Sequence, residues 1–207
     1  MSRLLIITGP QGSGNHVFSK CFAVHEDVYG WKSLLNTYWE GHHHEPFADA
    51  WNNPELLNSF DWTQNEYYVT SISCPYFANQ QPVIPQYEKF IKTAEQSVDV
   101  DIAVIGRDQT ILQYQQERVR GTHTTPLALE HFNWLIENTQ CTFISQELLY
   151  LYKQRYLEQI SRDLDWPVAY WDPEIDEILK QDANKKYIKD VHEYWLDFEV
   201  HRAQRES

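Results

Sequence analysis

The sequence predicts a three-layer α/β/α domain built on a mostly parallel β-sheet. Short apolar runs, which are typical of buried strands, alternate along the chain with stretches of helical periodicity. Hydrophobic residues make up 42% of the 207 positions, which is enough to fill the core of one domain. A glycine-rich turn joins the first apolar run to the first helical stretch. We therefore expect a single domain over residues 1–207.

The first part of the chain contains two predicted strands separated by an irregular segment. The apolar run at 3–8 predicts the first strand, and the periodic stretch at 15–24 predicts the first helix. Residues 29–62 are rich in aromatic side chains and histidine but lack a clean periodicity. We expect this cover segment to form short helices and loops over an edge of the active site. A second strand is expected at 66–73, just before Pro75.

The alternation continues to the end of the chain. Further strands are expected at 101–106 and 141–145, with a short one at 168–171, and helices at 85–97, 109–118, 127–138, 147–164, 173–181 and 188–201. Strands that alternate with helices form parallel sheets, in which ligands bind outside the carboxyl ends of the strands. The candidate site is therefore expected at that edge.

The last predicted helix has apolar residues at helical spacing. Such a pattern forms either a packing face of the domain or an interface with a partner. The residues concerned are Tyr187, Ile188, Val191, Tyr194, Trp195 and Phe198.

The net charge of −13 argues against a nucleic-acid or anionic membrane partner, because phosphate groups would be repelled. No apolar run approaches the length of a membrane span. Three scattered cysteines, Cys21, Cys74 and Cys141, form neither a disulfide framework nor a zinc pattern. We therefore expect a cytoplasmic protein without a metal site, and a small anionic ligand remains compatible with this charge.

The glycine-rich turn has the layout of a phosphate-binding loop. The spacing Gly9-x4-Gly14 fits the Walker A pattern, and glycine at 12 and 14 lets the backbone approach an anion closely. However, Asn15 and His16 stand where that pattern has Lys and Ser/Thr. These are the groups that contact the γ-phosphate and Mg²⁺ in ATPases. The loop therefore predicts phosphate or sulfate binding, and its alternative is a tight strand–helix turn.

An arginine at the end of a predicted strand is the second candidate for binding an anion. Arg107 directly follows the strand at 101–106, at the same edge of the sheet as the glycine-rich loop. A guanidinium group there could contact a phosphate through two hydrogen bonds. Taken alone, it could equally form a surface ion pair with Asp108.

Three segments resemble the sulfotransferases that use 3′-phosphoadenosine 5′-phosphosulfate (PAPS). Residues 9–16 are similar to the family's 5′-phosphosulfate loop, residues 102–115 to its strand–Arg–helix segment, and residues 143–149, 156–160 and 164–167 to its later strand and helix. The resemblance implies a P-loop-type fold that works without Mg²⁺. It also implies transfer of a sulfuryl group from PAPS to a hydroxyl or amine of a small-molecule or carbohydrate acceptor.

The resemblance also implies a set of cofactor-binding residues. These are Gly9, Gln11, Gly12, Ser13, Gly14, Asn15, His16, Arg107 and Gln115. Three positions depart from the family: Gly12 replaces a basic residue, Gln115 replaces the serine that contacts the 3′-phosphate, and Ser73 stands where many members have a catalytic histidine.

Because serine is a poor base, another residue must accept the acceptor's proton. We take His16, inside the loop, and His43, in the histidine run of the cover segment, as the catalytic candidates. Two other functions remain open at this stage. One is a nucleotide-binding or kinase-like protein with a degenerate Walker A loop, and the other is a binding protein of the same fold without catalysis.

Overall fold

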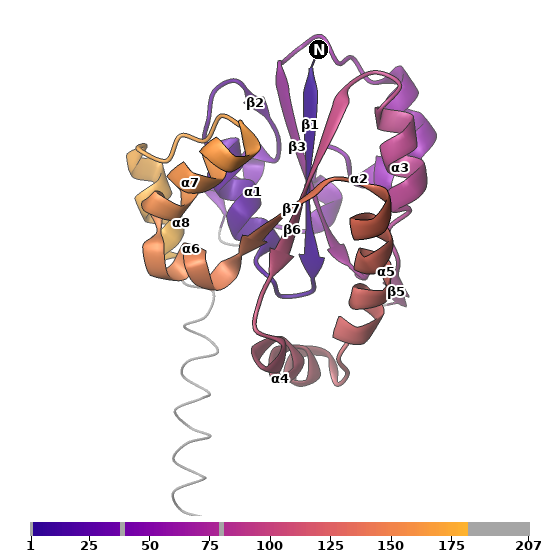
Figure 1. The fold of residues 1–207 in the computed structure, drawn as a ribbon, viewed down its shortest axis with the longest axis vertical. Helices are drawn as coiled ribbons and strands as arrows, with labels where there is room; N and C mark the ends of the chain where they lie inside the picture. Colours follow the sequence, from indigo (N-terminus) through magenta and orange to yellow (C-terminus); the bar gives the residue numbers. More distant parts are fainter. Residues whose placement is uncertain (1, 38–39, 79–80, 182–207) are drawn as a thin grey trace, which may run out of the picture.

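The fold is a five-stranded parallel sheet with helices on both faces, in a computed structural model that describes residues 2–37, 40–78 and 81–181 (Figure 1). The strand order is β2-β3-β1-β6-β7, and every neighbouring pair is parallel. The strands are β1 (Arg3–Pro10), β2 (Val28–Tyr29), β3 (Tyr67–Cys74), β6 (Asp99–Gly106) and β7 (Cys141–Ser145). The predicted α/β class with a mostly parallel sheet is therefore confirmed.

Helices α1, α6, α7 and α8 lie on one side of the sheet and α3 and α5 on the other (Figure 1). Their bounds are α1 (Asn15–Ala23), α2 (Ala48–Asn52), α3 (Tyr87–Ala94), α4 (Gln109–Arg120), α5 (Thr125–Asn138), α6 (Gln146–Tyr152), α7 (Gln154–Leu164) and α8 (Pro173–Lys180). Three 3₁₀ helices add Lys32–Asn36, His42–His44 and Pro54–Ser59, and none of the helices described is long and apolar enough to cross a membrane.

The side chains of β1 contribute alternately to two hydrophobic cores, one on each face of the sheet. Successive side chains of a strand point to opposite faces, so Leu4 and Ile6 pack with α3 and α5, whereas Leu5 and Ile7 pack with α1 and α7. All four side chains are completely buried. The strand is thus apolar on both faces, as a central strand of a parallel sheet requires, and its carboxyl end is held rigidly where the glycine-rich loop begins.

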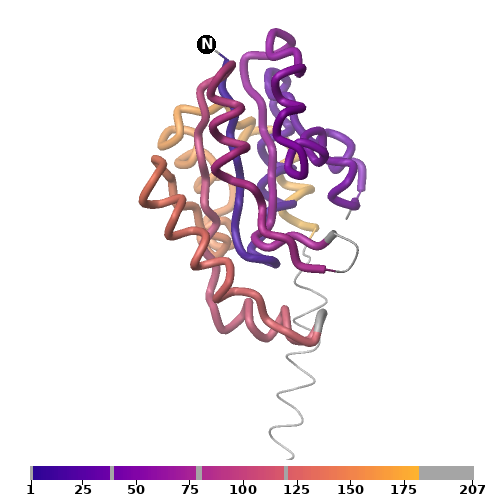
Figure 2. Tube along the Cα trace, turned by 90° about the vertical axis from the view of Figure 1, so that its right-hand side faces the viewer, coloured from indigo at the N-terminus to yellow at the C-terminus, as the bar shows by residue number. Residues whose placement is uncertain are grey.

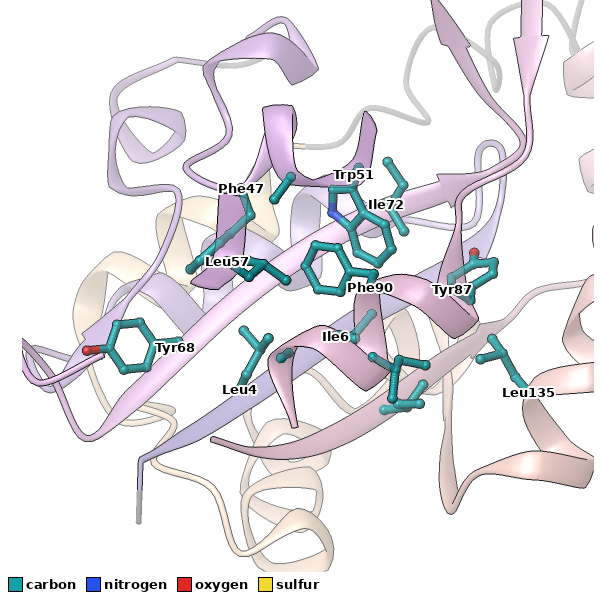
Figure 3. Packing of buried hydrophobic residues seen from close by; sticks show 14 of the residues in the cluster. Leu4, Ile6, Phe47, Trp51, Leu57, Tyr68, Ile72, Tyr87, Phe90 and Leu135 are labelled. Atoms are coloured by element: carbon teal, nitrogen blue, oxygen red, sulfur yellow. The ribbon is translucent and has the colours of Figure 1, made fainter. Parts of the chain in front are cut away.

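Much of the cover segment belongs to the core. Trp51 stacks on Phe90 of α3 with ring centroids 3.8 Å apart (Figure 3). The Nε1 of Trp51 also donates to Thr70 Oγ1 at 3.1 Å. Phe47 and Trp62 stack with centroids 5.8 Å apart and are also buried. These aromatic rings cover a face of the sheet, and a shorter stretch around Trp31 and the histidine run reaches the loop edge.

A small antiparallel hairpin, β4 (Tyr76–Ala78) and β5 (Gln81–Val83), follows β3 and was not predicted. The hairpin and α4 both lie at the end of the sheet where β1 ends (Figure 2). They are therefore neighbours of the loop edge.

Two predicted elements are wrong. The helix expected at 147–164 is broken at Lys153, whose backbone has φ 50° and ψ −125°. The break lets the Tyr156 hydroxyl accept the backbone N–H of Ser145 at 2.7 Å, although these residues would lie about 16 Å apart along a straight helix. The segment expected to form a strand at 168–171 is irregular and ends in a turn, with Val168 in the core and Trp171 exposed. The helix expected at 188–201 lies outside the described residues.

Candidate functional site

The loop between β1 and α1 lies where β1, β3, β6 and β7 all end. The backbone N–H of Ser13 donates to the carbonyl of Pro10 at 3.0 Å, which closes the turn. Gly12 and Gly14 have φ of 84° and 107°, a conformation that side chains with a Cβ rarely adopt. A Cβ at Gly14 would also lie 2.2 Å from Oε1 of Gln146 on α6. The two glycines are therefore required by the shape of the loop.

The first turn of α1 has backbone N–H groups that no side chain caps. Gly14 is the N-cap, and no side chain caps the helix. The first N–H groups of a helix have no intrahelical acceptor, and together with the helix dipole they favour a negative charge. Beside them, within the part of the chain that the structure describes, the Ser13 hydroxyl and the side-chain oxygens of Gln11 and Asn15 are buried without a hydrogen-bond partner. Such groups are normally satisfied in a folded protein. Of the three, only the Ser13 hydroxyl can donate a hydrogen bond to an anion, because the amide oxygens of Gln11 and Asn15 are acceptors.

Two side chains fasten the loop to the end of β6 and to α4. The Arg107 guanidinium donates to the carbonyl of Gly12 and, at 2.9 Å, to Oε1 of Gln115. Gln116, the next residue on α4, is buried, and its Nε2 donates to the carbonyl of Gln11 at 2.7 Å. The positive charge of Arg107 is therefore held against the loop by its hydrogen bonds to Gly12 and Gln115.

A further side of the loop is formed by β3 and α6. Asn15 Nδ2 donates to Ser73 Oγ at 2.8 Å, so Ser73 positions the first residue of α1. Gln146, the first residue of α6, lies against Gly14, and its Oε1 is buried without a partner among the described residues. Gln146 was not predicted as a site residue, although its place directly after the strand at 141–145 was the available signal.

Two half-buried histidines, His16 and His42, and the indole ring of Trp31 lie beside the first turn of α1. The ring of His16 lies 5.0 Å from that of Trp31 and 6.4 Å from that of His42. Burial lowers the pKa of His16 to about 4, with a smaller contribution from the charge of Lys20. Burial likewise lowers the pKa of His42 to about 4, and the neighbouring His16 adds to the effect. Both rings are therefore neutral near pH 7.

The other catalytic candidate, His43, lies apart from this cluster. Its side chain is exposed, and its ring pairs with that of His44 at 4.1 Å. The histidine that the structure brings to His16 is thus His42. Sequence alone could not separate three consecutive histidines, because their burial depends on how a single 3₁₀ turn packs.

Lys20 is a buried cation that the sequence did not single out. It lies one turn after His16 on α1, and its ammonium donates to the carbonyl of Thr37 and, at 2.9 Å, to Oε1 of Gln181. Burial lowers its pKa. A single lysine in a helical stretch of mixed polarity does not indicate from the sequence that its side chain is buried.

Glu45, next to the histidine run, is also fully enclosed. Its Oε2 accepts the backbone N–H of Phe47 at 3.0 Å. Burial raises the pKa of this carboxyl to about 8, although the nearby Thr70 hydroxyl and the backbone of Ser71 oppose the shift. Glu45 is therefore largely protonated at neutral pH.

The predicted binding residues converge, because Gly9 lies beside Ser73 near the end of β1, the loop follows, and Arg107 and Gln115 reach it from the end of β6 and from α4. Their binding of a ligand stays a prediction. Among the described residues, no cluster of three or more His, Cys, Asp or Glu could hold a metal ion.

No family model and no curated protein sequence matches this chain. Among solved structures, the fold is similar to a retinol dehydratase crystallised in complex with androsterone and the inactive cofactor PAP. The match covers 86% of this chain and 63% of that one, with 10% identical residues and a TM-score of 0.41. This chain thus spans less than two thirds of the length of that protein. A likeness at this level does not bear on which ligand the loop binds.

Proposed function

We propose that the protein is sulfotransferase-like, with PAPS bound at the loop between β1 and α1. The observation that carries the proposal is the anion-binding geometry of this loop. Two glycines with positive φ precede an uncapped helix, the buried Ser13 hydroxyl has no partner among the described residues, and the Arg107 guanidinium is adjacent. Asn15 and His16 provide neither the lysine nor the Mg²⁺-binding hydroxyl of an ATPase. A phosphosulfate, which the family resemblance implies needs no Mg²⁺, fits this set of residues better.

Each group around the loop has a role in this proposal. The N–H groups of the first turn of α1, including the backbone N–H of Asn15, and the Ser13 hydroxyl would hold the 5′-phosphosulfate. Arg107 and Gln115 would hold the 3′-phosphate, with the guanidinium exchanging its hydrogen bond to Gly12 for one to the phosphate. Charge-assisted hydrogen bonds from arginine to phosphate are stronger than those to a neutral carbonyl, which favours this exchange.

Bound PAPS would supply the sulfuryl group, which moves to a hydroxyl or amine of a small-molecule or carbohydrate acceptor. The residues of this chain would position the two reactants in line and stabilise the negative charge of the leaving phosphate. His16 is neutral and lies in the first turn of α1, so it would accept the acceptor's proton at a ring nitrogen. The cluster of His42 and Trp31 would hold its ring in place.

Titration calorimetry on the full chain tests the binding site. We expect adenosine 3′,5′-bisphosphate to bind at least about tenfold more tightly than ATP or GTP, with or without Mg²⁺, because only the bisphosphate engages Arg107. Arg107→Ala should remove most of this affinity. Arg162→Ala is the matched control, since Arg162 is exposed on α7 and pairs only with Glu158 among the described residues. If none of the three nucleotides binds, the proposal is wrong.

Transfer itself needs a separate measurement. PAPS carrying a labelled sulfuryl group should pass the label to hydroxyl or amine acceptors in a mixed small-molecule and carbohydrate panel. Bisphosphate binding with no transfer to any acceptor would favour a binding protein without catalysis. One observation already supports that second function: a histidine whose pKa is about 4 is a weak base.

A further inference from the structure

Helix α6 exposes an unusual amount of apolar side chain. Leu148, Leu151 and Tyr152, at helical spacing i, i+3 and i+4, are 39%, 65% and 58% exposed. Leu148 and Tyr152, together with Arg155 and two other residues of α7, line a hollow of about 260 Å³. We call Leu148, Leu151, Tyr152 and Arg155 the α6 surface. Contiguous apolar surface of this kind marks a place that another chain segment or molecule covers.

The α6 surface contains one positive charge and is bordered by another, although the chain as a whole carries a charge of −13. Lys153 follows Tyr152 directly, and Arg155 lines the hollow itself. Both side chains are exposed, and neither has a carboxylate partner among the residues that the structure describes. The surface therefore combines apolar contact area with two positive charges, and it suits an amphipathic and acidic segment.

The chain contains such a segment after the last described residue. In a helical projection, six of the seven apolar residues between 187 and 198 fall on one side, Leu196 falls on the opposite side, and three acidic residues lie along one flank of the apolar side. The apolar set is Tyr187, Ile188, Val191, Tyr194, Trp195 and Phe198, and the acidic set is Asp190, Glu193 and Asp197.

We propose that residues 187–198 dock on the α6 surface of the same chain. Their apolar side would cover Leu151 and Tyr152, and their acidic flank would lie toward Lys153 and Arg155. The position of Gln181 is compatible with this docking. The described chain ends at Gln181 after α8, and α8 and α6 lie on the same side of the sheet (Figure 1). Five residues, 182–186, separate Gln181 from Tyr187 and can span up to about 17 Å.

Cross-linking between native lysines tests the proposal. Lys189 lies within the docking segment, Lys153 borders the α6 surface, and Lys92 lies on α3 across the sheet. After treatment of the full chain with a short amine-reactive cross-linker, we expect Lys153–Lys189 products at least about tenfold above Lys92–Lys189 products. An equal mixture of isotopically light and heavy chains shows whether each cross-link joins residues of one chain.

Two variants and a control make the test specific. Leu151→Asp on the α6 surface and Trp195→Asp in the segment should each lower the Lys153–Lys189 yield about tenfold, since each places a carboxylate in an apolar contact. Ile136→Asp, at an exposed position of α5, should leave the yield unchanged. Equal yields with Lys92 and Lys153, or no effect of either variant, would overturn the proposal. Cross-links found only between light and heavy chains would also overturn it, because a second copy would then cover the surface.

Discussion

The guanidinium of Arg107 donates a hydrogen bond to Oε1 of Gln115, eight residues further along the chain, at 2.9 Å. The same guanidinium donates to the carbonyl of Gly12. The end of β6, the second turn of α4 and the glycine-rich loop are therefore joined through one side chain. A phosphate bound here would replace the contact with Gly12 and could keep Gln115 as the group that orients the guanidinium.

We expect Arg107→Ala to weaken the binding of adenosine 3′,5′-bisphosphate by about 2–3 kcal/mol, and Gln115→Ala by about 1 kcal/mol, because a charged hydrogen bond contributes more than a neutral one. Since Gln115 acts partly through Arg107, the double variant should lose less than the sum of the two. Titration calorimetry on the four proteins measures this coupling. Additive losses would show that the two side chains bind the ligand independently.

The sequence predicted those features of the site that depend on spacing along the chain. The alternation of strands and helices placed Arg107 and the loop at one edge, and the resemblance to the PAPS-dependent sulfotransferases implied that Gln115 belongs to the same site. Features that depend on packing were not predictable. The burial of Lys20 and Glu45 depends on segments distant in sequence, and the break at Lys153 is accompanied by a hydrogen bond between Ser145 and Tyr156. No local pattern encodes such contacts.

Gly14 and Gly121 both have positive φ, but only Gly14 is crowded. We expect Gly121→Ala to lower the free energy of unfolding by about 1 kcal/mol from backbone strain alone. Gly14→Ala should cost about 1–3 kcal/mol, because its Cβ also displaces the side chain of Gln146. Urea denaturation of both variants measures the difference.

The Gly14→Ala and Gly121→Ala variants also show whether ligand affinity depends on the shape of the loop or on the stability of the fold. Gly14→Ala should weaken binding of the bisphosphate at least about tenfold, since the N–H groups of the first turn of α1 would move. Gly121→Ala, with nothing within 4 Å of its Cβ, should leave the affinity unchanged. Equal affinities in the two variants would contradict the assignment of the loop as the binding site.

Glu45 makes the protein less stable as the pH rises. Its pKa is about 8 in the folded chain and 4.5 in a model carboxyl, so between these values the folded state keeps a proton that the unfolded state releases. The free energy of unfolding should therefore fall from about pH 4.5 to pH 8. Glu45→Gln should be more stable than the natural chain by about 1–3 kcal/mol at pH 8 and similar to it at pH 4.5.

Chemical denaturation at several pH values checks this. Glu55→Gln, at an exposed position paired with Lys89, is the control and should change the profile little. A Glu45→Gln protein that is less stable than the natural chain at pH 8 would show that the ionised carboxylate contributes favourably to the fold.

His42 makes the protein less stable as the pH falls. Its pKa is about 4 in the folded chain, below the ordinary value of 6.5, so the unfolded chain takes up a proton in this range before the folded chain does. Above about pH 6.5, His42 therefore does not lower the free energy of unfolding, and this free energy falls as the pH decreases toward 4. His42→Gln should reduce the loss between pH 7 and pH 5 by about 1–2 kcal/mol. His43→Gln, one position further along but exposed, should leave the profile unchanged. Equal effects of the two substitutions would contradict the half-buried position of His42 beside His16.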